Sequence, residues 1–115
     1  MRIVVDNIPI DELKEMSEKM YENLVIAVVD LNKGIMVVDA EFHADEEALL
    51  LEHDSEQKNL WGINLYPDMI EDKNKWIEFD SMINIRPYAG NRSRYVEDPK
   101  IREKIIVIVN KLVQK

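Results

Sequence analysis

The alternation of apolar and polar positions in the first third of the chain predicts three short strands. Residues 2–6 form a short apolar run that is typical of a first strand. Residues 24–31 and 35–42 are two β-branched runs joined by the tight turn Asn32-Lys33-Gly34, which indicates a β-hairpin. The first of these two runs is almost wholly apolar, so we expect it to be covered on both faces.

Two segments have the 3.6-residue periodicity of amphipathic helices that pack one face on a core. The first spans residues 11–24 with Asp11 as the predicted N-cap. Its apolar stripe consists of Leu13, Met16, Met20 and Leu24. The second begins at Asp98 and Pro99, which supply an N-cap and a first helical residue. Its buried stripe is predicted to contain Ile101, Ile105, Ile108 and Leu112.

The middle of the chain predicts three further strands. Residues 45–53 have the composition of a helix, but the polar turn that follows leaves little room, and we interpret residues 48–53 as a strand. Residues 60–67 form the next strand, which ends in proline. Residues 76–87 are predicted to form a long strand with one apolar and one polar face.

Together these elements predict a single domain over residues 1–115, in the order β-α-β-β-β-β-β-α. Consecutive strands joined by short polar turns indicate a largely antiparallel meander sheet of five to six strands. Two amphipathic helices suit one face of such a sheet. The expected fold class is therefore α+β, in the form of a two-layer sandwich.

Composition and charge narrow the classes of function. The chain has no cysteine, so we expect no disulfide and no thiolate metal site, and the cytoplasm is the expected compartment. No apolar run approaches the roughly 18 residues of a membrane-spanning helix. The formal net charge of −8 argues against a partner such as duplex nucleic acid. Residues 86–115 nevertheless hold 8 basic and 3 acidic residues, a net charge of +5 on an acidic body.

The basic loop between residues 82 and 99, called here the arginine loop, is the most distinctive stretch of the sequence. Arg86, Arg92 and Arg94 lie here, and Gly90 allows the backbone to turn. Guanidinium groups bind carboxylates and phosphates through parallel hydrogen bonds, so the three arginines are candidate anion ligands. We favour the alternative that they pair with carboxylates of the acidic body and hold the loop in place.

A short motif of acidic residues and histidine supplies weak candidates for a metal site. Glu41, His43 and Asp45 alternate at the end of a predicted strand, and either Glu52 or His53 would join them from the next strand. The sequence leaves open which of the two shares a face with His43. We favour a solvated hairpin end with turn chemistry, and we predict no metal.

The polar face of the predicted strand at residues 76–87 is a third candidate site. This strand is expected to pair with the predicted strand at residues 60–67. If the polar side chains of both strands lie on the same face, polar side chains from three segments converge beneath the arginine loop. The floor of such a pocket would contain Glu41, His43, Asn64, Asp80, Asn84 and Arg86. An exposed sheet face with cross-strand charge pairs is an equal alternative.

Residues 41–55, 60–67 and 80–105 resemble the shared blocks of a family of short uncharacterised prokaryotic proteins of unknown function. The resemblance covers nearly the whole chain. It implies no assigned activity and no catalytic residue.

Binding is favoured over catalysis. The leading hypothesis is a small cytoplasmic protein that binds an anionic small molecule or a protein partner, without a cofactor. Arg86, Arg92 and Arg94 would recognise the charge, and Asn84, Asn91 and His43 would orient the ligand. The alternatives are a metal-dependent or acid–base enzyme centred on the Glu41–Asp45 motif, and a homodimeric interaction protein.

Overall fold

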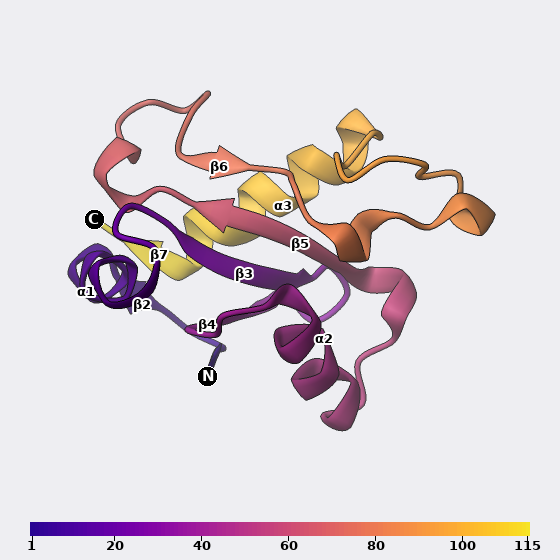
Figure 1. Cartoon of the computed structure of the whole chain (residues 1–115), viewed down its shortest axis with the longest axis horizontal. Helices are drawn as coiled ribbons and strands as arrows, with labels where there is room; N and C mark the ends of the chain where they lie inside the picture. Colours follow the sequence, from indigo (N-terminus) through magenta and orange to yellow (C-terminus); the bar gives the residue numbers. More distant parts are fainter.

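A five-stranded antiparallel sheet forms the centre of the computed structural model, which describes residues 1–115 (Figure 1). Its strands are β1 (Arg2–Val4), β3 (Val25–Asp30), β4 (Ile35–Val38), β5 (Leu60–Leu65) and β6 (Ile77–Glu78). They lie in the order β1-β4-β3-β5-β6, so β1 and β6 are the two edges. A small parallel pair consists of β2 (Ile8–Pro9) and β7 (Val113–Gln114).

Three helices pack against this sheet, two on one face and one on the other. α1 (Ile10–Met20) and α3 (Pro99–Leu112) cover the face that carries the larger core. α2 (His43–Glu52) lies on the opposite face, mainly over β3 and β4 (Figure 1). The predicted α+β class, the antiparallel sheet and the two helices on one face are confirmed.

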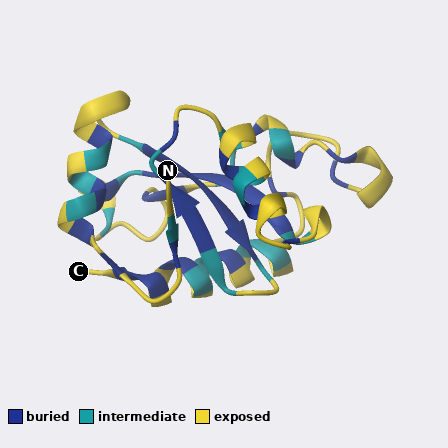
Figure 2. Ribbon diagram, turned by 90° about the horizontal axis from the view of Figure 1, so that it is seen from below, coloured by how far each residue is buried: buried dark blue, intermediate teal, exposed yellow.

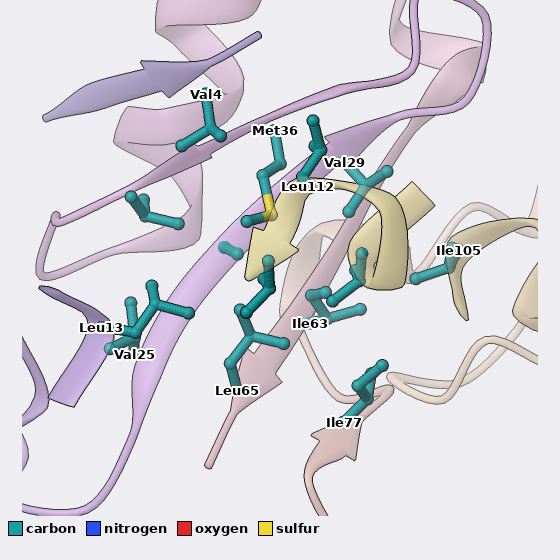
Figure 3. Close-up of a cluster of buried hydrophobic side chains, with 14 of the residues drawn as sticks. Val4, Leu13, Val25, Val29, Met36, Ile63, Leu65, Ile77, Ile105 and Leu112 are labelled. Atoms are coloured by element: carbon teal, nitrogen blue, oxygen red, sulfur yellow. The ribbon is translucent and has the colours of Figure 1, made fainter. Parts of the chain in front are cut away.

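β3 is buried on both faces because helices cover both sides of the sheet at this strand. Alternate residues from Val25 to Val29 face α1 and α3, within a core of 19 buried residues (Figure 3). Val28 faces the other way and packs with Leu50 of α2. The predicted two-sided burial of this strand is confirmed, and Figure 2 shows the buried strands flanked by exposed segments.

The helix boundaries follow local capping chemistry. α3 begins as predicted, since the Asp98 side chain accepts a hydrogen bond from the Lys100 backbone N–H (2.8 Å) and Pro99 is the first helical residue. α1 begins at Ile10, so Asp11 lies in the first turn and is not the N-cap. None of the helices combines the length and apolar character needed to span a membrane.

The predicted strand at residues 48–53 is wrong, because residues 48–52 belong to α2 and His53 follows the end of the helix. The chain turns sharply before and after this helix, where Asp39 and Asp54 both have a φ of 69°. Asp adopts this left-handed conformation more readily than most residues. Because of these two sharp turns, α2 fits between β4 and β5, which the sequence did not indicate. Glu52 and His53 are exposed at the end of the helix, so neither lies on a strand face.

The predicted strand at residues 76–87 is strand for only two residues. β6 pairs with β5 at Ile77 and Glu78, and two 3-10 turns follow, η3 (Met82–Asn84) and η4 (Pro87–Ala89). The continuous polar face expected along this segment therefore does not form. The reason is that two polar side chains of the segment, and not its backbone, form hydrogen bonds with the outer edge of β5.

Glu46 of α2 places an ionisable group in an apolar setting. It is completely buried, and neither carboxyl oxygen has a hydrogen-bond partner. Burial raises its pKa from 4.5 to about 10. The amino-terminal ammonium opposes this shift, whereas the carboxylates of Asp39 and Asp45 add to it. The side chain is therefore a neutral carboxylic acid at pH 7.

We expect Glu46→Gln to stabilise the protein increasingly as the pH rises. Unfolded Glu46 ionises near pH 4.5 while the folded residue stays protonated, so unfolding releases a proton above this pH and stability falls. Chemical denaturation should show a gain of about 2–4 kcal/mol at pH 8 and under about 1 kcal/mol at pH 4. Glu52→Gln, at the exposed end of the same helix, is the control. Equal gains from both variants would contradict the expectation.

Candidate functional site: two clefts that share an ion pair

Beyond the end of β6, side chains form hydrogen bonds with the backbone groups at the outer edge of β5. Asn84 is completely buried, and its Oδ1 accepts a hydrogen bond from the Gly62 N–H (2.9 Å) while its Nδ2 donates to the Gly62 carbonyl (3.0 Å). Farther along the strand, the Arg86 guanidinium donates to the carbonyls of Leu60 and Gln57. An amide and a guanidinium thus replace the backbone of a neighbouring strand.

Arg86 is a framework residue. It is 3% exposed, and its Cζ lies 4.2 Å from the centroid of the Trp61 ring. Burial lowers its pKa, and no carboxylate forms an ion pair with it. Nη1 and Nη2 donate to backbone carbonyls inside the fold and Nε is buried without a partner, so Arg86 cannot contact a ligand in this structure. The role in charge recognition predicted for it needs this correction, and the same holds for the ligand-orienting role of Asn84.

Asn91 organises the arginine loop from within. It is buried, and its Nδ2 donates to the carbonyls of Asn84 (2.8 Å), Ser93 (3.0 Å) and Tyr95 (2.9 Å). Its Oδ1 accepts from the backbone N–H of Glu97 (2.9 Å). Both N–H groups of Nδ2 are used inside the loop, one of them shared between two carbonyls, so Asn91 is also a framework residue.

The amide groups of the arginine loop already bind an anion, which is the carboxylate of Glu97. This carboxylate accepts hydrogen bonds from the backbone N–H groups of Arg92 (3.0 Å) and Ser93 (2.8 Å) and from the Ser93 hydroxyl (2.6 Å). The bond from the Ser93 hydroxyl, together with the two amides, lowers the pKa of Glu97. A residue of the same chain thus occupies the anion site that these backbone amides form.

Arg92 and Arg94 are the exposed arginines of the loop, and they differ in their contacts. Arg94 forms a two-point ion pair with Asp80, with Nε 2.7 Å from Oδ1 and Nη2 3.2 Å from Oδ2. The Arg92 side chain forms no hydrogen bond or ion pair and lines neither of the two clefts described next. The favoured interpretation, pairing with the acidic body, therefore holds for Arg94.

A cleft of about 1010 Å³, called here the larger cleft, lies along the β6 edge of the sheet. Its walls come from the segment that follows β5, from β6 and from the arginine loop. The charged residues in its walls are Lys73, Lys75, Glu78, Asp80 and Arg94. Sequence reasoning missed the two lysines, because they lie in a polar stretch that has the ordinary composition of a solvated loop.

A cleft of about 360 Å³, called here the His43 cleft, lies on the sheet face that α2 covers only in part. His43 comes from the first turn of α2, Asn64 from β5 and Asp80 from the segment after β6. Glu41 and Arg94 also line it. Four of the six residues of the predicted pocket floor therefore converge, while Asn84 and Arg86 are buried elsewhere.

The ion pair of Asp80 with Arg94 is a wall common to both clefts. A chain of hydrogen bonds runs beside it. Asn64 Nδ2 donates to Glu78 Oε1 (2.8 Å), and the Tyr66 hydroxyl donates to the same oxygen (3.1 Å). Partial burial and the bond to Glu78 raise the pKa of Tyr66, so its hydroxyl stays a neutral donor. The two clefts are thus connected through fixed polar groups.

His43 is held in one tautomer. Its Nε2 lies 2.8 Å from the Ile63 carbonyl oxygen, which can only accept, so Nε2 carries the proton and Nδ1 is a bare acceptor. Burial lowers the pKa of His43, and the ring is therefore neutral at pH 7. Gly62 permits this close packing, because a Cβ there would lie 3.1 Å from His43 Cδ2 and 2.5 Å from Ser81 Cβ.

The side chains of the Glu41–Asp45 motif are not gathered as a set of metal ligands. No group of three or more His, Asp or Glu side chains lies close enough together to hold a metal ion. His43 begins a helix instead of ending a strand, and Asp45 lies outside the His43 cleft. The alternation on one strand face that suggested a ligand set is therefore absent.

Comparison with known proteins gives a family without an activity. The model of a family described as a protein of unknown function, DUF5674, matches residues 2–112. No curated protein matches the chain. No solved structure matches it.

We expect Asn84→Ala to destabilise the protein by about 3 kcal/mol, because it leaves the buried N–H and carbonyl of Gly62 without partners. Arg92→Ala, in the same segment, removes no contact and should change stability by less than about 0.5 kcal/mol. Denaturant unfolding of both variants checks the pair. Similar losses from the two substitutions would show that Asn84 does not have this role.

Proposed function

We propose that this chain binds a small organic anion in its larger cleft. The chain belongs to DUF5674, a family of unknown function. The single observation that carries the proposal is the gathering of cationic side chains around this cleft on an acidic protein. Lys73, Lys75 and Arg94 outnumber Glu78 and Asp80 there, three charges against two, on a chain of net charge −8. An anion is attracted to this region and repelled by the rest of the surface.

Arg94 keeps donors available although it is paired with Asp80. The carboxylate occupies Nε and one N–H of Nη2, and Nη1 has no partner. The remaining N–H groups point along the free end of the guanidinium and suit a carboxylate or phosphate oxygen.

The apolar part of the larger cleft indicates the rest of the ligand. Its apolar wall consists of Met69, Ile77, Phe79, Tyr95 and Ile106. The Phe79 and Tyr95 rings pack edge to face with centroids 6.3 Å apart. A volume of about 1010 Å³ is within the range of ligand sites. We therefore expect an anion with an apolar or aromatic body.

This proposal retains the anion hypothesis with different residues. Arg94 remains from the predicted set, and the two lysines replace Arg86 and Arg92. The homodimer, the cytoplasmic location and the exclusion of duplex nucleic acid remain predictions.

We expect benzoate and phenyl phosphate to bind the larger cleft with dissociation constants of roughly millimolar size, as suits small fragments. In an NMR titration of the ¹⁵N-labelled chain, the amides of Lys73, Lys75 and Ser93 should shift. Arg94→Gln should weaken binding about fivefold or more, because it removes a charged donor, and Asp80→Asn should strengthen it, because it removes a competing carboxylate.

Arg92→Gln is the matched control. It removes the same charge two positions earlier in the chain, at a side chain that lines neither of the two clefts. It should change affinity by less than about twofold. Equal losses in the Arg92 and Arg94 variants would mean that anions are attracted only by overall charge, and the proposal would then fail.

A further inference from the structure

We infer that the His43 cleft is a second binding site, of opposite charge preference, which takes the ammonium group of a small organic amine. The proposal is independent of anion binding in the larger cleft. It rests on the acceptors that line the cleft, on its charge and on its apolar rim.

His43 presents a hydrogen-bond acceptor in a fixed orientation. The Ile63 carbonyl fixes the proton on Nε2, which leaves Nδ1 as an acceptor, and the Asn64 side chain lies beside the ring. His43 is half-buried and lines the cleft. A neutral imidazole nitrogen in this state can only accept, so its partner must be a donor.

The walls of the His43 cleft contain more acidic than basic side chains. Glu41 and Asp80 contribute two carboxylates, and Arg94 is the one cation, already directed at Asp80. The wall thus has an excess of one negative charge, whereas the larger cleft has an excess of one positive charge. A group with several N–H donors and a positive charge satisfies both carboxylate and imidazole acceptors, and an ammonium group has these properties.

Exposed apolar side chains form the rim of the His43 cleft. Phe42 and Met82 are 63% and 64% exposed, and Tyr21 is 40% exposed, although all three are large apolar residues. All three line the His43 cleft. The Tyr21 hydroxyl donates to the Glu41 carbonyl, which holds this ring at the entrance. Aromatic rings bind cations through their faces and also pack against an apolar ligand body.

Three probes with one ring and different head groups test the inference: benzylamine, benzyl alcohol and benzoate. In NMR titrations at pH 7.5, benzylamine should shift the amides of Phe42, His43 and Asn64 and bind about tenfold or more tightly than benzyl alcohol. Benzoate should leave these amides unchanged. Equal affinity for the amine and the alcohol would overturn the proposal, because it would leave only contacts of the apolar rim.

Two variants of the shared ion pair separate this proposal from the anion site. Asp80→Asn should weaken benzylamine binding about fivefold or more, and Arg94→Gln should strengthen it, because the cation that competes for Asp80 is gone. Both effects are opposite in sign to those on benzoate. If benzoate responds as expected and benzylamine does not, the second site fails alone. If benzylamine shifts amides all over this acidic surface, its binding is unspecific and the inference fails.

The pH provides a readout that needs no substitution. The charged and titratable groups that face His43 are Asp80, Arg94 and Glu41, with Tyr21 at the rim. As the pH falls through the lowered pKa of His43, Nδ1 gains a proton and can no longer accept, so benzylamine affinity should drop. His43→Leu should bind benzylamine about fivefold more weakly at pH 7.5 and lose this pH dependence. An unchanged affinity in a folded His43→Leu variant would contradict the inference.

Discussion

The outer edge of β5 is the constraint on which the rest of the structure depends. β6 pairs with it only near Asn64 and Leu65, and beyond that point the backbone groups of Gly62 and Leu60 would be buried without partners. Each such group costs about 1–3 kcal/mol when unsatisfied. Asn84 and Arg86 supply the missing partners. In doing so they hold the chain after β6 against the sheet, and with it the arginine loop.

This arrangement explains why two clefts meet at one ion pair. Between Glu78 and Asn84 the chain leaves the sheet edge, and Asp80 pairs instead with Tyr95 in an isolated bridge. The Asn84 side chain also donates to the Arg94 carbonyl (3.0 Å), so the same amide that bonds β5 positions the arginine. Asp80 and Arg94 then stand where the chain departs from the edge, with one cleft on each side.

Features whose cause lies within a few residues could be predicted from the sequence. The turn at Gly34 and the cap at Asp98 are of this kind, because their hydrogen bonds join near neighbours. The roles of Asn84 and Arg86 could not be predicted, since a polar residue that bonds the edge of a distant strand has the same pattern as one that faces water. The convergence of His43 with Asp80 was predicted from strand parity, although a helix turned out to supply His43.

A sheet edge closed by side chains also affects how this protein behaves at high concentration. Exposed strand edges are templates on which a second chain can add a strand and begin aggregation. Beyond β6, the groups of β5 that an incoming strand would need are already bonded to Asn84 and Arg86. At the opposite edge, β1 offers only three residues. The framework that shapes the clefts therefore also guards the sheet against intermolecular strand pairing.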